Sequence, residues 1–174
     1  MTSPSPTTAD LSTFTGSWVL DPSRTSIAFH TKAMWVLPVK GTAKATEGRG
    51  AVGADGTLTG RLVVDVASIS TKVKKRDAHL QTADFFDVAS YPTITFEATG
   101  ARPADGGKIE VDGDLTVHGQ TRPITLLTEV DISGTSATVT TEVAIDRAAW
   151  GIDATPLGAG LHNRVVVHAH FDRA

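Results

Sequence analysis

Two histidines, His168 and His170, stand two positions apart near the end of the chain, in the stretch RVVVHAHFD. In a β-strand this spacing projects both rings from one face, as a metal site would require. A metal site usually needs a third protein ligand, and the outward face of a terminal strand offers none that the sequence identifies. We therefore interpret the pair as polar residues on an exposed face, and we predict neither a metal nor another cofactor.

Three other side chains could meet the polar group of a ligand. Arg76 and His79 lie in the charged stretch KKRDAHL, and Arg147 precedes AAWGI. A structural ion pair involving Arg76 and Asp77, and a structural hydrogen bond of His79, are the competing interpretations. For Arg147 we expect a buried charge that caps one end of the fold, pairs with an acidic residue and packs near Trp150.

Support for catalysis is thin. The sequence has no G-x-S-x-G, no H-E-x-x-H and no glycine-rich phosphate loop. Because it has no cysteine, it has no thiolate nucleophile and no disulfide. We predict that the protein is not an enzyme. The alternative is a small β-barrel enzyme acting on an apolar substrate, built on Arg147 or His79 with a carboxylate partner.

Length and charge limit the classes of protein to which the chain can belong. A chain of 174 residues with 40% hydrophobic and 20% charged residues suits one globular domain. A net charge of -3 gives no general case for nucleic-acid binding, and no run approaches the roughly 20 apolar residues of a membrane span. The first residues lack the basic and apolar regions of a secretory signal, so we expect a cytoplasmic protein. Residues 1–15 are rich in Ser, Thr and Pro, which predicts a disordered tail before a single domain at 16–174.

Alternation of apolar and polar residues dominates the chain. In KIEVDGDLTVH, the residues Ile109, Val111, Leu115 and Val117 share one face, and turn signals such as PADGG and HGQTRP separate the alternating runs. The pattern predicts eight strands, near residues 17–21, 25–36, 40–52, 58–70, 93–101, 107–118, 122–132 and 136–147, with a ninth segment at 163–172. The fold class is therefore all-β and antiparallel.

Apolar faces on so many strands must be buried between two sheets or inside one closed sheet. A barrel of about eight strands encloses either packed side chains or one small ligand. The inner residues lean towards Val, Thr, Ala and Gly, and aromatic residues make up only 6%, which favours a cavity. A dry barrel that acts as a stress or interaction module is the alternative.

One segment, KKRDAHLQTADFFDVASYP, interrupts the strands with a helical, charged and aromatic insert. A barrel that holds an apolar molecule must close an end against water, because exposing its lining costs roughly 25 cal/mol per Å². Leu80, Phe85 and Phe86 offer apolar cover, and charged side chains such as Arg76 and Asp77 can fasten the insert to the rim. We interpret residues 72–92 as a lid, and call them the lid segment.

Four stretches of the chain resemble successive signatures of the YceI-like, polyisoprenoid-binding family. They are SWVLDPSRTSIAFHTK, ISTKVKKRDAHLQTADFFDVASYPTITFEATG, GDLTVHGQTRPITL and IDRAAWGI, and the resemblance runs from about Trp18 to the end. The resemblance implies a lipocalin-like antiparallel barrel with a long apolar pocket for an isoprenoid or fatty-acyl chain. It also implies frequent homodimers and no catalytic residues. The expected function is therefore binding, transport or sequestration of a polyisoprenoid, an isoprenoid quinone or a fatty-acyl chain.

The inward face of the strands and the lid segment supply the candidate ligand-binding residues. They are Phe29, Leu62, Val64, Leu80, Phe85, Phe86, Phe96, Val111, Leu115, Val117, Leu126, Val143, Ile145 and Phe171. The same residues could instead fill a dry core. The candidates for a head group or for fastening the lid are Arg76, His79 and Arg147.

Three consecutive large apolar residues, Trp35, Val36 and Leu37, break the alternation. On a strand, at least one of them must face outward. An exposed apolar edge often forms a two-fold interface, so the sequence predicts a homodimer.

Overall fold

The computed structural model describes residues 10–155 and 159–174. Its strands are β1 Gly16–Leu20, β2 Ser26–Ala33, β3 Leu37–Val52, β4 Leu58–Ser70, β5 Thr93–Pro103, β6 Ile109–Val117, β7 Gln120–Ser133, β8 Ser136–Asp146 and β9 His162–Arg173. Its helices are α1 Lys74–Leu80 and the 3-10 turns η1 Leu11–Phe14, η2 Pro22–Arg24, η3 Asp105–Gly107 and η4 Arg147–Trp150. None of these helices is long and apolar enough to cross a membrane.

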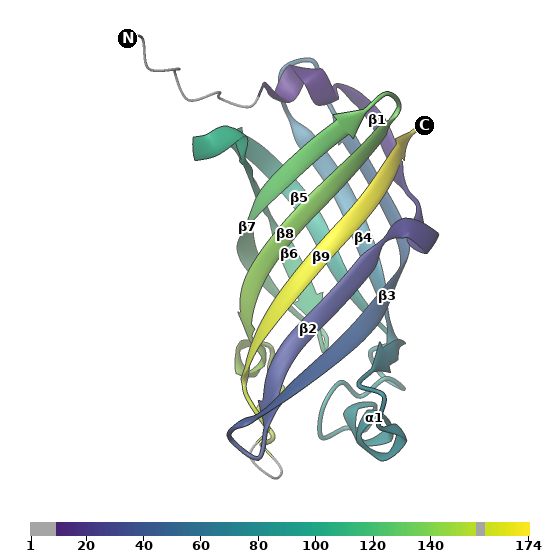
Figure 1. The fold of residues 1–174 in the computed structure, drawn as a ribbon, viewed down its shortest axis with the longest axis vertical. Coiled ribbons are helices and arrows are strands. Elements are labelled where there is room, and N and C mark those ends of the chain that lie inside the picture. The colour runs from purple at the N-terminus through teal and green to yellow at the C-terminus, as the bar shows by residue number, and fades with distance from the viewer. Residues whose placement is uncertain (1–9, 156–158) are drawn as a thin grey trace.

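The strands form one antiparallel sheet that closes on itself (Figure 1). Closure comes from the pairing of β3 with β4, which joins the two ends of the strand order β3-β2-β9-β8-β7-β6-β5-β4. The short β1 pairs with the same two neighbours as β2, namely β3 and β9. The nine strands therefore occupy eight positions, and the predicted eight-stranded lipocalin-like barrel with one short helix is confirmed.

A built-in break separates β1 from β2. Pro22 has no backbone N–H for a sheet ladder, and Asp21 caps the turn by accepting a hydrogen bond from Ser23 N at 2.9 Å. Arg24 bridges the break to β9, with nitrogens 2.7 Å from carboxylates of both Asp21 and Asp172. These contacts explain why one barrel position holds two strands.

The predicted strand 25–36 ends earlier in the structure, at the hairpin between β2 and β3. Ala33 pairs directly with Leu37, so residues 34–36 form the turn rather than a strand. Met34 and Trp35 have φ values of 49° and 63°, in the left-handed region that an extended strand does not use. The prediction that Trp35 and Val36 lie on a strand is wrong, and so the strand-edge argument for a homodimer no longer applies. The homodimer itself stays a prediction.

Residues 10–15 differ from the predicted disordered tail, 1–15. Residues 1–9 lie outside the described residues, but Leu11–Phe14 form η1, with Asp10 accepting from Ser12 N at 2.9 Å. Trp18 Nε1 donates to the Phe14 carbonyl at 2.8 Å, and this bond holds η1 over one end of the barrel. Arg173, near the other end of the chain, also donates to the carbonyls of Thr13 and Thr15, and composition gives no sign of such long-range contacts.

The lid segment lies at the other end of the barrel (Figure 1). Its predicted helix is present as α1, followed by turns until β5 begins after Pro92. The Pro92 carbonyl accepts a hydrogen bond from Val66 N at 3.0 Å, which returns the chain to the sheet beside β4.

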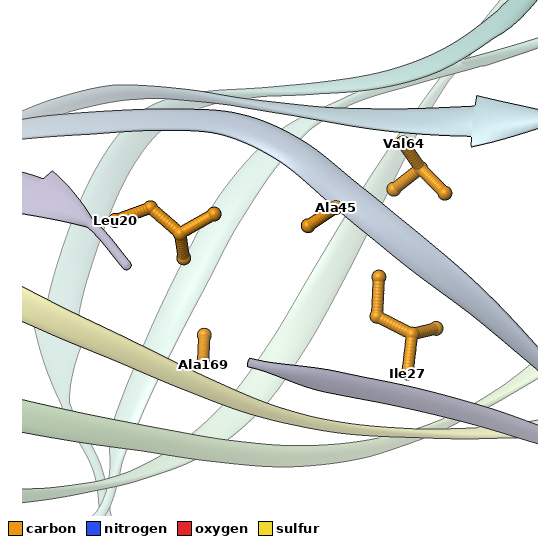
Figure 2. Close-up of a cluster of buried hydrophobic side chains, with 5 residues drawn as sticks. All are labelled: Leu20, Ile27, Ala45, Val64 and Ala169. Carbon is orange, nitrogen blue, oxygen red and sulfur yellow. The ribbon is translucent and has the colours of Figure 1, made fainter. Parts of the chain in front are cut away.

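Two apolar clusters line the interior. Figure 2 shows the first, in which Leu20, Ile27, Ala45, Val64 and Ala169 point from five strands into a common space. Two of these five side chains are single methyl groups, so this cluster leaves open space beside it. The second cluster lies at the lid end and joins Phe85 to residues of β6, η4 and the segment after η4.

Candidate functional site

The barrel encloses a cavity of about 1150 Å³ that extends from η1 to the lid segment. All fourteen predicted ligand-binding residues line it: Phe29, Leu62, Val64, Leu80, Phe85, Phe86, Phe96, Val111, Leu115, Val117, Leu126, Val143, Ile145 and Phe171. Arg76, His79 and Arg147 line it as well. The alternation accounts for the strand residues in this set, the lid interpretation accounts for Leu80, Phe85 and Phe86, and contact of any of them with a ligand stays a prediction.

Two phenylalanines are folded against the wall instead of filling the space. Phe29 is paired directly with Gly41, and a Cβ at Gly41 would overlap its ring. In the same way, the ring of Phe96 covers Gly113 on the neighbouring strand. Each ring uses the volume of a missing side chain, so the centre of the barrel stays open.

The hydroxyl groups inside the barrel are satisfied by the barrel itself. Thr128 Oγ1 donates to the Ile109 carbonyl at 2.8 Å, and Thr141 Oγ1 donates to the Leu127 carbonyl at 2.9 Å. A buried hydroxyl with a backbone partner presents its methyl group to the cavity. The surface of the cavity is therefore apolar even at these two threonines.

Arg147 is buried, as predicted, but its partners differ from the prediction. Its guanidinium donates to four carbonyls, those of Ile152, Ala154, Ala159 and Gly160, at 2.7–3.3 Å, instead of pairing with an acidic residue. Carbonyl oxygens of the following loop can satisfy a guanidinium as fully as a carboxylate does, and sequence gives no signal of this.

The electrostatics of Arg147 follow from this position. Burial lowers the pKa of its guanidinium from the ordinary value, and the charges of Asp146 and Asp153 oppose that effect. Its Cζ atom also lies 5.2 Å from the centre of the Phe85 ring, which is a cation–π contact. The side chain thus ties the segment after η4 to the lid segment.

The start of the lid segment is anchored at Thr71, the residue that follows β4. Thr71 is buried, and its N–H donates to Asp77 Oδ1 at 2.8 Å while its hydroxyl accepts from Arg76 Nε at 2.7 Å. Arg76 and Asp77 therefore meet at Thr71, as the predicted rim contacts require. No ion pair joins these two side chains directly in the described parts of the chain.

His79 is held within the lid segment. Its Nε2 lies 3.1 Å from Asp84 Oδ2, and its ring stands edge-on to Phe85 with centroids 5.1 Å apart. These contacts orient the imidazole at the lid end of the cavity.

The H-x-H pair builds no metal site. His168 is exposed, and His170 Nε2 lies 3.5 Å from Asp172 Oδ1. Across residues 10–155 and 159–174, no group of three potential metal-ligating side chains comes together.

The candidate ligand-binding set omitted part of the lining. Five omitted residues lie on the alternating apolar faces that the sequence identifies: Ile94, Ile109, Val139, Val165 and Val167. Leu11, Phe14 and Met34 also line the cavity, but they lie in a segment predicted to be disordered and in an unpredicted turn. No local signal identified them.

A family model described as the YceI-like domain matches residues 18–172. The chain belongs to the YceI-like family. A UPF0312 protein of Vibrio cholerae is 44% identical over 66 residues, which cover 38% of this chain and 35% of that protein. Protein YceI of Escherichia coli O157:H7 is 40% identical over 65 residues, 37% of this chain and 34% of the relative. The matches thus span about a third of the length of these curated relatives.

Solved structures show the same fold. BcnA of Burkholderia cenocepacia superposes with a TM-score of 0.79 at 22% identity, covering 87% of this chain and 98% of BcnA. A polyisoprenoid binding domain from Saccharophagus degradans, implicated in plant cell wall breakdown, superposes with a TM-score of 0.72 at 15% identity. This superposition covers 90% of this chain and 98% of that domain. The YceI-like resemblance and the barrel expected from it are confirmed.

Proposed function

We propose that this YceI-like barrel is a non-catalytic carrier or sequestering protein for one long apolar molecule: a polyisoprenoid, an isoprenoid quinone or a fatty-acyl chain. The observation that carries the proposal is the apolar cavity of about 1150 Å³, which runs from η1 to the lid segment. Ordinary small-molecule pockets span roughly 300–1,000 Å³. An elongated, larger cavity with satisfied hydroxyls fits an extended hydrocarbon better than a compact polar metabolite.

The polar end of such a ligand would lie at the lid segment. Arg76 and His79 line that end of the cavity, and one face of each is already engaged by Thr71 and Asp84. Arg147 is the weaker head-group candidate, because four backbone carbonyls use its donors. A carboxylate, phosphate or quinone oxygen would find donors at Arg76 and His79, with Lys32 and Lys75 also lining the cavity.

Binding is favoured over the alternative of a barrel enzyme. General acid–base chemistry needs two titratable groups that converge on a substrate. No Asp or Glu is among the lining residues that the structure describes, and the one buried cation, Arg147, is tied to carbonyls. The named polyisoprenoid ligand class of the Saccharophagus domain supports the same choice.

The direct test is native mass spectrometry followed by organic extraction. We expect the purified protein to carry a hydrophobic adduct, and the stripped protein to bind a fluorescent fatty-acyl or polyprenyl probe. A stripped, folded protein that binds neither probe would exclude the carrier function. Turnover of the extracted molecule would favour the enzyme instead. The homodimer and the cytoplasmic location are further parts of this proposal, tested by light scattering and by cell fractionation.

A further inference from the structure

The exposed apolar side chains gather at one end of the barrel. Eight large apolar side chains are exposed in the described residues, and five of them belong to two segments at the same end of the barrel. These five are Met34, Trp35, Val36, Leu37 and Val73. Trp35 is 77% exposed and Val36 is 73% exposed. We call Met34–Leu37 the hairpin tip; it comprises the turn between β2 and β3 and the first residue of β3, at the same end as α1 (Figure 1).

The backbone holds the hairpin tip away from the core. Met34 and Trp35 both adopt positive φ, which costs energy for bulky side chains and which Gly or Asn would adopt more easily. The base of the turn is fixed, because Ala33 pairs with Leu37 and the Lys32 carbonyl accepts from Gly160 N at 2.7 Å. A strained backbone that presents a tryptophan to solvent does nothing for packing, and such strain concentrates at functional sites.

Lysines lie on both segments at this end of the barrel. Segments 32–40 and 72–77 hold six cationic residues and one acidic residue, and the rest of the lid segment adds Asp84, which pairs with His79, and Asp87, although the whole chain has a net charge of -3. The cationic residues are Lys32, Lys40, Lys72, Lys74, Lys75 and Arg76. Asp77, the acidic residue, already binds Thr71. The five lysines are exposed, and within the described residues the lysine that forms an ion pair is Lys108, at the opposite end of the barrel.

The cavity reaches this same surface. Lys32, Met34 and Val73 line the cavity and also belong to the exposed segments. At the opposite end, Leu11 and Phe14 of η1 cover the cavity. A molecule that enters or leaves past the lid segment would therefore pass beside the hairpin tip.

We propose that the hairpin tip and the lysines at its end of the barrel dock the protein onto the surface of an anionic lipid bilayer. Trp35, Val36 and Leu37 would enter the interface between head groups and acyl chains, and the lysines would lie among the anionic head groups. A second copy of this chain is the other occupant with the right apolarity. A two-fold contact would, however, bring the same lysines against each other, which disfavours it.

The protein carries its own probe for the test. Of its three tryptophans, Trp18 and Trp150 are 6% and 5% exposed, so a change of solvent exposure reports on Trp35. The full-length protein is titrated with vesicles of phosphatidylglycerol and phosphatidylcholine, and with vesicles of phosphatidylcholine alone. We expect a blue shift of emission, quenching by brominated lipid and co-flotation, with the anionic vesicles at low salt only. No cavity ligand is needed, so this test and the test of carrier function fail independently.

Matched variants separate the apolar and the electrostatic contributions. Trp35→Ala, followed by co-flotation, should weaken vesicle binding by about tenfold, and Lys74→Gln with Lys75→Gln should weaken it by about thirtyfold at low salt. Leu127→Ser removes an exposed apolar side chain from the barrel wall, and Lys108→Gln removes a lysine from the far end; both should bind as the wild type does.

Two outcomes would overturn the proposal. The first is a wild-type protein that neither floats with anionic vesicles nor changes its Trp35 emission at low salt. The second is Trp35 emission already blue-shifted without vesicles, together with a solution mass of twice 18.2 kDa, which would show that a second copy covers the tip.

Discussion

The ring of Phe29 lies across Gly41, the residue directly opposite it on the neighbouring strand. The three atoms nearest to a Cβ at Gly41 all belong to this ring, so the phenyl group would have to move if the glycine were replaced. The other face of the Phe29 ring borders the cavity. The pair thus acts as a spacer that keeps an aromatic residue out of the lumen.

Replacing Gly41 by alanine should close part of the cavity. The ring of Phe29 would turn into free space, so we expect a stability loss of about 1–2 kcal/mol and a drop in affinity for a fluorescent fatty-acyl probe of about tenfold. Gly100→Ala is the control, because its Cβ would meet nothing within 4 Å. If adding Phe29→Ala to the Gly41 variant did not restore probe binding, the spacer role would be wrong.

The N-terminal segment is expected to contribute to stability. Deleting residues 1–15 removes Leu11 and Phe14 from the cavity end and takes away the acceptor of Trp18 Nε1. We expect a loss of about 1–3 kcal/mol, which lowers Tm by about 2–4 °C per kcal/mol. Phe14→Ala should reproduce much of the loss, while Thr13→Ala, on an exposed position, should not. An unchanged Tm after deletion would show that η1 is not needed to close the barrel.

The break between β1 and β2 should be sensitive to acid. Hydrogen bonds from Ser23 and then from Arg24 lower the pKa of Asp21 to about 2. A lowered pKa means that the carboxylate stabilises the fold above the ordinary value near 3.8, and that this contribution is lost as pH falls towards about 2. Asp21→Asn should therefore melt below the wild type at pH 5 and together with it at pH 2. A constant difference in Tm over this range would contradict the assignment.

Arg147 should be irreplaceable by lysine. An ammonium cannot donate to four carbonyls in different directions, so Arg147→Lys leaves buried acceptors unpaired. We expect urea denaturation to show a loss of about 2–4 kcal/mol. Arg164→Lys alters an exposed pair with Glu142 at 3.5 Å and should stay within about 0.5 kcal/mol of the wild type. Equal losses in the two variants would mean that the carbonyl contacts are unimportant.

Period-two alternation predicted the antiparallel strands and their inward faces, because each strand has one buried face whose residues repeat every second position. The choice of a closed barrel over two packed sheets rested on the family resemblance. The same rule failed at Met34 and Trp35, since a turn built from bulky residues carries none of the usual Gly, Asn or Pro signals. The partners of Arg147 could not be predicted from the sequence either, because they are backbone carbonyls of a loop that has no periodic residue pattern.

The cavity volume was the property least open to prediction. It depends on which residue faces each phenylalanine across the sheet, and that register is set by turns and bulges along the whole strand. The alternation of β2 predicts that Phe29 points inward, but only the register places Gly41 beneath it. The sequence therefore predicted which strand residues face inward, while the structure was needed to show that these residues enclose an open cavity.

A polar group placed inside the cavity should harm binding more than folding. Leu115 lines the cavity towards the lid end of β6 and is paired with Phe96. In a filled core, Leu115→Asn would bury an unpaired amide at a cost of several kcal/mol. In an open cavity that takes up water, the stripped protein should lose only about 1–2 kcal/mol, because the amide stays hydrated.

The bound chain would have to remove that water. Affinity for a fluorescent fatty-acyl or polyprenyl probe should therefore fall by about tenfold for each 1.4 kcal/mol of lost hydration. The measurement pairs the Tm of the stripped protein with its probe affinity, and Leu127→Asn on the exposed wall is the control that should change neither. A Leu115 variant that does not fold, beside a wild type that binds no probe, would mean that the interior behaves as a filled core. A folded variant with weakened binding is the outcome expected if water and the apolar chain compete for the same space.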